Sequence, residues 1–267
     1  MTLAERSRKA AGSLVRGTVG MLPFFEYRLE VARVRSTLAL RRRENELVER
    51  FESRSGPLPP ADVAVVIPTY RRPEGLRAAV DSALAQTVTD LRVVVVDDGA
   101  GIDTSLPDDD RLSVLALPEN VGVAGIVRNV GIRMSRSRLI AFLDDDNTWE
   151  PDHLARALPA HRDGAELTYS SLRRVDGDGV DIDVLGEPFD RRALRDRSLI
   201  DTNAIVVRRG DDVIFSRVRR GLHDFPGEDW ELAWRLSRRL RVQHLPYTTV
   251  RYVCHDGSNY TDWNSEA

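Results

Sequence analysis

The chain has 267 residues, which is long enough for one large domain or for one domain with an appendage. Its hydrophobic fraction of 42% and charged fraction of 30% suit a globular protein, and a net charge of −3 gives no general signature of nucleic-acid binding. Cys254 is the single cysteine, which excludes an internal disulfide and a thiolate cluster for zinc. No segment approaches the roughly 20 apolar residues of a membrane span, and no signal-peptide core is evident, so we expect a cytoplasmic protein.

Residues 1–55 differ from the rest of the chain because they are rich in Arg and Glu. Within them, four apolar residues recur at helical spacing: Tyr27, Val31, Val34 and Leu38. Residues 55–60 read Ser-Gly-Pro-Leu-Pro-Pro, which is typical of a stiff linker. We therefore predict a helical extension and linker over residues 1–60, docked either on the main domain or, in a homodimer, on a second subunit.

The Arg-rich composition of this extension allows a second interpretation, in which it forms a basic surface that contacts anionic lipid. That interpretation would place the protein peripherally at the inner face of a membrane. Acidic residues are interspersed among the basic ones, and this favours docked helices over a lipid-binding surface.

A regular alternation of strands and helices begins at Val63. Short apolar, β-branched runs predict buried strands at 63–67, 92–96, 112–117 and 139–143. Helical patterns lie between them at 74–87 and 123–134, and Pro151 suits the first turn of another helix. This order predicts an α/β fold, with a mixed, mostly parallel sheet flanked by helices.

The second half of the chain is less regular. Its pattern predicts strands at 167–172 and 204–207, a hairpin turn at 176–179, a helix at 228–240 and an extended segment at 242–253. We expect the segment from Asp176 to Ile200 to shape one side of a site, but its residues indicate no specificity.

Three of the predicted strands end in polar residues: Pro68-Thr69-Tyr70, Asp97-Asp98-Gly99 and Asp144-Asp145-Asp146. Ligands of parallel sheets bind beyond the carboxyl ends of the strands, so these ends predict a single site. The three adjacent carboxylates at 144–146 repel one another unless a cation lies with them. Mg²⁺ or Mn²⁺ is usually held by one or two carboxylates plus substrate phosphates. The pattern thus indicates a metal-bridged phosphate site, with a solvated acidic turn as the alternative.

Five segments carry a family resemblance: Val65-Val66-Ile67-Pro68-Thr69-Tyr70, Val94-Val95-Val96-Asp97-Asp98-Gly99, Asn120-Val121-Gly122 with Arg128-Asn129-Val130-Gly131, Asp144 to Trp149, and Gly227-Glu228-Asp229-Trp230. In this order they resemble family 2 of the nucleotide-sugar-dependent glycosyltransferases, which has the GT-A fold, over roughly residues 62–255. The resemblance implies a GT-A domain at 61–267, with a nucleotide-binding half at 61–150 and an acceptor-binding half at 151–267.

For the donor, the resemblance implies that Pro68, Thr69 and Tyr70 line a nucleobase pocket. It also implies that Asp98 accepts a hydrogen bond from the base. Arg128 would meet the pyrophosphate, for which a guanidinium fork is well suited, and a surface arginine is the competing interpretation. The implied donor is a nucleoside diphosphate sugar, with UDP as the expected nucleotide.

The acidic block resembles the D-x-D motif of the family. By this resemblance, Asp146 is the principal ligand of Mg²⁺ or Mn²⁺, and Asp144 or Asp145 contacts the ribose or reaches the metal through water. His255 occupies a position where some relatives present a histidine to the metal or diphosphate, although His255-Asp256-Gly257 also suits a turn. Such a metal neutralises charge on the leaving diphosphate.

Asp229 is the general base that the resemblance implies, in an inverting reaction on an acceptor hydroxyl. A carboxylate at a helix start also suits an N-cap, which is the structural alternative. Because an ordinary Asp has a pKa of about 3.9, its pKa must be raised for it to act as a base, unless bond breaking at the donor acidifies the acceptor.

Two other functions fit part of the pattern. A nucleotidyltransferase that makes sugar nucleotides would carry a Gly-rich loop after the first strand, where Arg71-Arg72 follows Tyr70 instead. A non-catalytic sugar-nucleotide-binding protein would not need Asp146 and Asp229. The acceptor stays open among glycan, lipid carrier, protein and natural product, and no nucleic-acid partner is expected.

Overall fold

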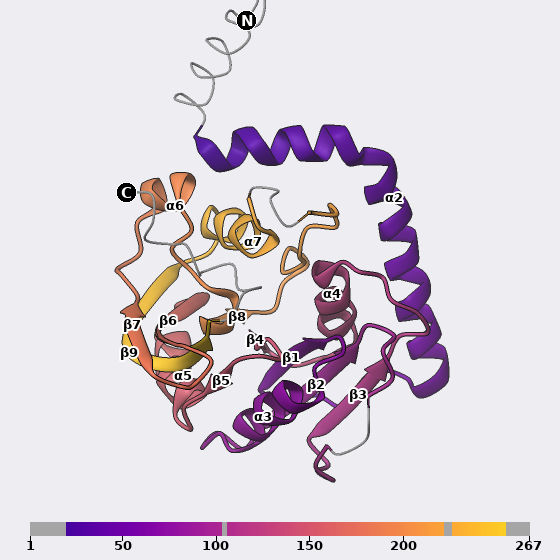
Figure 1. Cartoon of the computed structure of the whole chain (residues 1–267), viewed down its shortest axis with the longest axis horizontal. Coiled ribbons are helices and arrows are strands. Elements are labelled where there is room, and N and C mark those ends of the chain that lie inside the picture. Colours follow the sequence, from indigo (N-terminus) through magenta and orange to yellow (C-terminus); the bar gives the residue numbers. More distant parts are fainter. Residues whose placement is uncertain (1–19, 103–105, 222–225, 255–267) are drawn as a thin grey trace, which may run out of the picture.

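The computed structural model describes residues 20–102, 106–221 and 226–254. In this part of the chain a nine-stranded sheet is covered by helices (Figure 1). Its strands are β1 (Val63–Thr69), β2 (Leu91–Asp97), β3 (Leu112–Ala116), β4 (Leu139–Phe142), β5 (Thr148–Trp149), β6 (Leu167–Val175), β7 (Asp181–Leu185), β8 (Ile205–Arg208) and β9 (Val242–Val253). Their order is β3-β2-β1-β4-β8-β6-β9-β5, and β7 pairs with β6.

The first half of the sheet is parallel, as the apolar runs predict. β1 lies between β2 and β4 and is parallel to both, and β3 extends the parallel set beyond β2. Residues 63–67 and 93–96 have no exposed surface, because helices cover both faces of these strands. β8 is antiparallel to β4 and to β6, so the sheet becomes mixed beyond β4.

The helices that follow the strands are α3 (Pro73–Leu84), α4 (Ala124–Met134), α5 (His153–Arg162), α6 (Arg191–Asp196) and α7 (Glu228–Ser237), with a short 3₁₀ turn, η1 (Thr202–Ala204). α4 packs closely on the sheet at Gly131. A Cβ atom there would lie 2.7 Å from Cγ1 of Val66 and 3.1 Å from Cγ2 of Val96. A side chain at position 131 would therefore clash with the sheet, and glycine allows this close packing of α4.

The predicted N-terminal helix is present as α2 (Met21–Ser55), which runs along one side of the molecule and then turns down another (Figure 1). The turn is at Arg33, which leaves helical geometry with φ −119° and ψ 15°. Ser36 Oγ donates to the carbonyl of Arg33 (2.8 Å), so this carbonyl keeps a partner at the kink. None of the helices among the described residues is both long and apolar enough to cross a membrane.

α2 docks on the domain, but not through its apolar stripe. Tyr27, Val31, Val34 and Leu38 are 69%, 59%, 53% and 51% exposed. The sequence left open whether the helix docks on the main domain or on a second subunit, and in this structure the apolar stripe does not face the domain. The buried residues of α2 lie on either side of this stretch, and they include Leu47, Val48 and Glu44.

Glu44 is the polar anchor of α2, and it has no exposed surface. Its oxygens accept hydrogen bonds from Asn129 Nδ2 (3.0 Å) and Arg133 (3.1 Å) on α4. They also accept from Nε (2.8 Å) and Nη2 (2.7 Å) of Arg217. These hydrogen bonds compensate for the burial of the carboxylate, so Glu44 fixes α2 to α4 and to the segment that contains Arg217.

Candidate active site

A cleft of about 520 Å³ opens at the carboxyl ends of β1, β2 and β4. Eight of the residues predicted from the sequence line it: Pro68, Thr69, Tyr70, Asp98, Arg128, Asp144, Asp145 and Asp146. Residues that the sequence reasoning did not assign to the site also line it, among them Arg72, Asn147, Glu228 and Tyr252. The three strand ends therefore meet at one cleft, as expected from the sequence.

The ends of β1 and β2 are held level with each other. Thr69 is paired with Asp97 in the parallel register, and the backbone N–H of Asp98 donates to the Thr69 carbonyl (2.9 Å). Gly99 then turns the chain with φ 74°, and a Cβ atom there would lie 2.3 Å from the backbone of Glu119. The Asp97-Asp98-Gly99 sequence thus ends the strand where only glycine fits.

The two adjacent carboxylates of this turn have different surroundings. Asp97 accepts from the N–H groups of Ala100 (3.0 Å) and Gly101 (2.9 Å), and it thereby stabilises the turn after β2. Asp98 lines the cleft and accepts from the N–H groups of Val121 (2.7 Å) and Gly122 (3.0 Å). Burial raises the pKa of Asp98, while these two hydrogen bonds act in the opposite direction.

Asp144 is locked in place by two neighbouring elements. Its backbone N–H donates to Asn203 Oδ1 (2.6 Å), and Asn203 Nδ2 donates back to its carboxylate (3.2 Å). Nη2 of Arg128 lies 2.5 Å from its Oδ1. Both oxygens therefore have protein partners, so the Asp144 carboxylate is oriented before any ligand binds.

Asp145 and Asp146 differ in what holds them. Asp145 is buried, its Oδ2 accepts from Thr69 Oγ1 (2.7 Å), and burial raises its pKa. Asp146 is the more open of the two, and its Oδ1 accepts from Asn147 Nδ2 (2.9 Å). Nη1 of Arg72 contacts both carboxylates, at 3.2 Å from Asp145 and 2.5 Å from Asp146.

The acidic block provides a limited set of ligands for a cation. Among residues 20–254, apart from the two undescribed gaps, no three His, Cys, Asp or Glu side chains are grouped so as to hold a metal. The carboxylate of Asp146 is partly exposed and lines the cleft. One carboxylate together with substrate phosphates is a usual set of ligands for Mg²⁺. The residues fit a metal that arrives with a diphosphate, provided that Arg72 releases Asp146. His255 lies outside the described residues.

Arg128 is a buried residue of the cleft, so the interpretation as an exposed surface arginine is wrong. It is 6% exposed, and its guanidinium lies over the ring of Phe215, 5.0 Å from the centroid. Nη1 lies 3.2 Å from Oε1 of Glu228, and Nη2 contacts Asp144. Burial alone would lower the pKa of Arg128, but the charges of Asp144 and Glu228 outweigh it and raise the pKa.

Asp229 lies in the first turn of α7, beside this cluster. Gly227 holds the N-cap position and makes no side-chain cap bond, so the interpretation of Asp229 as an N-cap is wrong. The Asp229 carboxylate accepts from the N–H of Trp230 (2.7 Å), and a Cβ atom at position 227 would come within 2.4 Å of its Oδ1. Glycine at 227 therefore gives the carboxylate its space.

The carboxyl group of Asp229 is enclosed by protein although the residue keeps some accessible surface. This burial, with the charge of Glu228 second, raises its pKa to about 6. Arg128 opposes the shift, so the group lies within electrostatic range of the cleft. Glu228, however, is the α7 carboxylate that lines the cleft, and Asp229 lies next to it rather than on the lining itself.

A second buried carboxylate, Asp201, was missed by the sequence reasoning. Its Oδ1 accepts from both the backbone N–H and Nδ2 of Asn203, each at 2.8 Å. Asn203 thus bridges Asp201 and Asp144. Burial, followed by the charge of Asp144, raises the pKa of Asp201 to about 7. The signal in the sequence was an Asp-x-Asn pair directly after the apolar residues 199–200, which is typical of an Asx turn.

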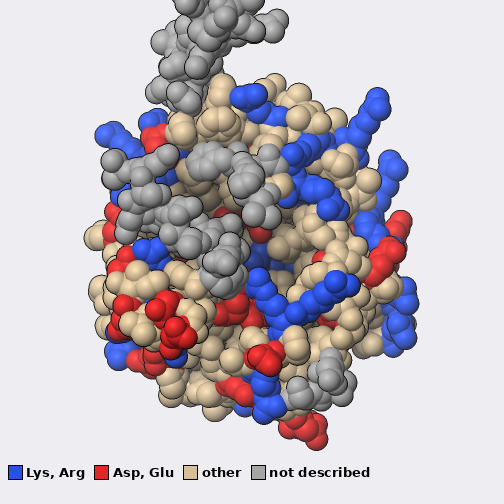
Figure 2. All heavy atoms as spheres, viewed as in Figure 1, with Lys and Arg blue, Asp and Glu red and all other residues tan. Residues whose placement is uncertain are grey.

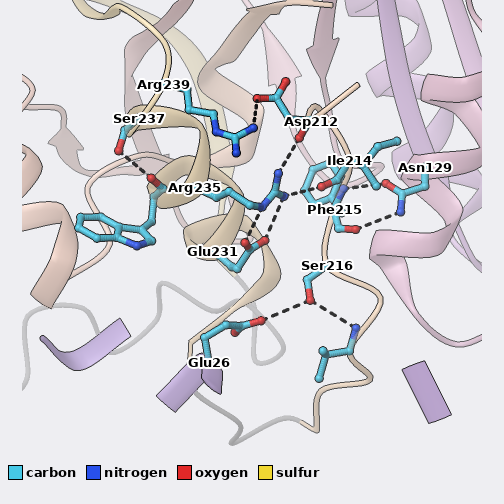
Figure 3. A network of polar contacts seen from close by, with 12 residues as sticks. Glu26, Asn129, Asp212, Ile214, Phe215, Ser216, Glu231, Arg235, Ser237 and Arg239 are labelled. Atoms are coloured by element: carbon cyan, nitrogen blue, oxygen red, sulfur yellow. Dashed lines mark hydrogen bonds and ion pairs between the residues drawn. The ribbon is translucent and has the colours of Figure 1, made fainter. Parts of the chain in front are cut away.

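The helices that carry Arg128 and Asp229 are joined through the segment between β8 and α7 (Figure 3). Arg235 of α7 donates to the carbonyls of Asp212 (2.6 Å) and Ile214 (2.5 Å). One residue further, the N–H of Phe215 donates to Asn129 Oδ1 of α4 (2.7 Å). These bonds fix the start of α7 relative to α4, and with it the two sides of the cleft.

Comparison with known proteins identifies the family of this chain. The profile of Glycosyl transferase family 2 matches residues 64–218. That match covers more than half of the chain and includes the strand ends, the D-x-D block, Arg128 and Asn203. The chain therefore belongs to glycosyl transferase family 2, a family of sugar-transferring enzymes.

Individual relatives match over a shorter stretch. The chain is 37% identical to the succinoglycan biosynthesis protein ExoO of Rhizobium meliloti (strain 1021) over 132 residues, which are 47% of this chain and 37% of ExoO. It is 31% identical to chondroitin synthase of Escherichia coli over 145 residues, which are 51% of this chain and 20% of the synthase. The chain thus matches well under half of the length of these relatives.

Solved structures confirm the fold. Residues 1–349 of S. aureus TarS superpose with a TM-score of 0.58 at 19% identity, covering 72% of this chain and 60% of TarS. The complex of the same protein with UDP-GlcNAc gives a TM-score of 0.57 at 19% identity, covering 74% and 60%. At this level of identity the likeness supports the GT-A architecture expected from the sequence.

Proposed function

We propose that this protein is a metal-dependent, inverting glycosyltransferase that moves a sugar from a nucleoside diphosphate to an acceptor hydroxyl. The observation that carries the proposal is the position of three chemically different groups around one cleft. Asp98 provides a buried carboxylate that can accept a hydrogen bond, Asp146 provides a partly exposed carboxylate, and Arg128 provides a buried guanidinium.

The nucleoside end of the donor is proposed to bind at the ends of β1 and β2. Tyr70 is 38% exposed and offers a ring face for stacking on a base. Asp98 is oriented by two backbone N–H groups and retains lone pairs for an N–H donor of the base, as uracil presents. The complex of the structural neighbour TarS with UDP-GlcNAc supports UDP as the nucleotide.

The diphosphate is proposed to lie between Asp146 and Arg128. Mg²⁺ or Mn²⁺ held by Asp146 would neutralise the charge that develops on the leaving group. Arg128 is held by Asp144 and Glu228 and cannot turn to solvent, so its charge is already oriented for phosphate oxygens. Asp144 and Asp145 then orient Arg128 and the turn at residues 144–146.

Asp229 is proposed as the general base that accepts the proton of the acceptor hydroxyl. A pKa of about 6 leaves the carboxylate ionised at neutral pH and makes it a better proton acceptor than an ordinary Asp. Glu228 competes for this role because it lines the cleft directly, although its contact with Arg128 favours a part in binding. The names of ExoO and chondroitin synthase support a saccharide as the acceptor.

Binding and chemistry are tested separately. Nucleoside diphosphates and their sugars are screened by thermal shift with Mn²⁺ and with a chelator, and UDP with Mn²⁺ is expected to raise the Tm. Asp229→Asn is then expected to keep this shift and to lose donor turnover. A chain whose Tm no nucleoside diphosphate raises would contradict the donor assignment. Turnover that survives in Asp229→Asn but not in Glu228→Gln would transfer the role of base to Glu228.

A further inference from the structure

The outer side of α2 combines exposed apolar and basic residues around the kink at Arg33. We call the exposed side chains of residues 27–42 the elbow face. Its apolar members are Tyr27, Val31, Val34 and Leu38, each more than half exposed. Large apolar side chains that cluster on a surface mark a contact with a partner or a membrane.

Arginines line both edges of this apolar stripe. Arg28, Arg35 and Arg42 are exposed at intervals of seven residues; Arg35 and Arg42 lie along one row of the helical segment after the kink, and Arg28 lies on the segment before it. Arg41 is exposed on the other edge. Glu30 is the one exposed acidic residue between positions 27 and 42, so the elbow face is strongly basic. Basic side chains project along the right-hand edge of the molecule in Figure 2, where the second arm of α2 lies in Figure 1, with a group of acidic side chains between them.

We propose that the elbow face docks on the surface of an anionic lipid bilayer. Apolar side chains of an interfacial helix enter the boundary between headgroups and acyl chains, while arginines at their edges pair with lipid phosphates. The long stems of Arg28, Arg35 and Arg42 can lie along the apolar boundary with their charged ends at the headgroups.

The charge of the elbow face argues against the homodimer suggested by the sequence. Two copies of this face would set arginines against arginines, with Glu30 alone to offset them. The kink at Arg33 also divides the stripe between two helical segments, so two helices cannot pair along a continuous seam. Nucleic acid would gain nothing from Val31, Val34 and Leu38, which present only aliphatic surface.

A second exposed apolar stripe provides a contrast within the same molecule. Val180, Ile182 and Val184 are 61%, 51% and 53% exposed along β7 and the turn before it. Here the intervening residues are Asp181 and Asp183, which pair with arginines of β6. An anionic surface has no charge attraction for this stripe, so β7 serves as a matched control for α2.

Docking through the elbow face would orient the cleft relative to the bilayer. Glu44 joins α2 to α4, which carries Arg128, and to Arg217 in the segment that precedes α7. A rigid connection of this kind favours acceptors that are themselves held at a membrane. The docking proposal does not depend on the proposed function, because lipid binding is measured without donor or acceptor.

The test is flotation of the full chain with phosphatidylcholine vesicles, with and without an equal part of phosphatidylglycerol. We expect flotation with the anionic vesicles alone, and weaker flotation as the salt concentration rises. An arginine near such a surface contributes about fivefold to partitioning, so Arg28→Gln, Arg35→Gln and Arg42→Gln together are expected to reduce binding roughly a hundredfold.

The apolar contribution is tested with Val34→Ser and Leu38→Ser, which are expected to reduce binding at least about tenfold. The matched control is Ile182→Ser with Val184→Ser, which removes side chains of the same exposure and is expected to leave binding unchanged. Unchanged Tm values show that each variant is folded. Failure of the full chain to float with anionic vesicles would overturn the proposal, as would equal losses in the β7 control. A dimer in light scattering that Val34→Ser and Leu38→Ser dissociate would overturn it in favour of a second copy.

Discussion

Arg72 Nη1 lies 2.5 Å from Oδ2 of Asp146, the carboxylate proposed to hold the metal. The same nitrogen lies 3.2 Å from Oδ1 of Asp145, so one guanidinium neutralises two adjacent carboxylates of the D-x-D block. The charges of Asp146 and Asp145 raise the pKa of Arg72 although burial acts to lower it. A divalent cation held by Asp146 would have to displace this guanidinium, for which a bound diphosphate would be a new partner.

Arg72→Gln is therefore expected to strengthen Mn²⁺ binding to the protein without nucleotide, by roughly tenfold, because the competing charge is removed. Titration of Mn²⁺ followed by water-proton relaxation measures this affinity directly. Arg77→Gln is the control, since Arg77 forms a similar ion pair with Asp81 (2.7 Å) on the same helix, outside the cleft. Equal Mn²⁺ affinity in Arg72→Gln and the unchanged protein would show that Arg72 does not compete with a metal.

Asp229→Asn is expected to lower kcat by roughly 10²–10⁴-fold, which is the range for loss of a general base. The apparent affinity for the nucleotide is expected to change little, since Asp229 does not line the cleft. Steady-state kinetics with UDP release as the readout give both quantities. Asp211→Asn, an exposed carboxylate before α7, is the control that should behave as the unchanged protein.

The rate of the unchanged protein is expected to fall at acid pH. Because burial raises the pKa of Asp229 to about 6, the base is protonated below that pH and ionised above it. A plot of kcat/KM against pH should therefore rise through an apparent pKa near 6 and then level off. An acid limb near 4 would instead indicate an unshifted carboxylate as the base.

Asp201 is expected to make the fold less stable as pH rises. Its pKa is raised from 3.8 to about 7, so the folded protein holds a proton that the unfolded chain loses above pH 3.8. Its contribution is thus fully present below about pH 4 and is lost as pH rises through 7. Asp201→Asn keeps an oxygen that can accept the hydrogen bonds of Asn203. It is expected to remove the decrease in unfolding free energy between about pH 4 and pH 7, which amounts to at most about 4 kcal/mol. The free energy of unfolding of both proteins is measured by chemical denaturation at about pH 5 and about pH 8. An identical pH dependence would show that Asp201 is ionised throughout.

Glu44→Ala is expected to lower the free energy of unfolding by about 3 kcal/mol, because Arg133 and Arg217 then lose a buried partner. Glu46→Ala is the control on the same helix. Glu46 is 64% exposed at its side chain and pairs with Arg43 at 3.6 Å, so its loss should cost less than about 1 kcal/mol. Denaturant unfolding measures both, and equal costs would contradict the role of Glu44 as the anchor of α2.

The strand ends were predictable because each follows a continuous apolar run. The apolar runs of β1, β2 and β4 are buried, and Thr69, Asp98 and Asp144, which lie at or just after the ends of these runs, line the cleft. Asp98, Asp145 and Asp146 were found in this way. Their roles toward a donor came from the family resemblance and stay predictions.

Other parts of the site were not predictable from local pattern. Asn203 reaches Asp144 because β8 lies antiparallel beside β4, a pairing between segments more than fifty residues apart. The face through which α2 docks was not predictable, because periodicity measures apolar spacing and takes no account of the carboxylate of Glu44, which is buried with its arginine partners. Arg71 adopts φ 57°, a backbone conformation that is uncommon for residues other than glycine, and nothing in the local sequence pattern indicates it.

The contacts of Glu44 bear on where the protein can be shortened. Residues 55–60 look like a boundary in the sequence, yet a chain that starts after them would leave Asn129 and Arg217 facing a hole that water must fill. Arg128 is next to Asn129 in the sequence, and its guanidinium lies over the ring of Phe215, whose carbonyl accepts a hydrogen bond from Asn129. We therefore expect a catalytic fragment to need the part of α2 that carries Glu44, because that part packs against α4, the helix on which Arg128 lies.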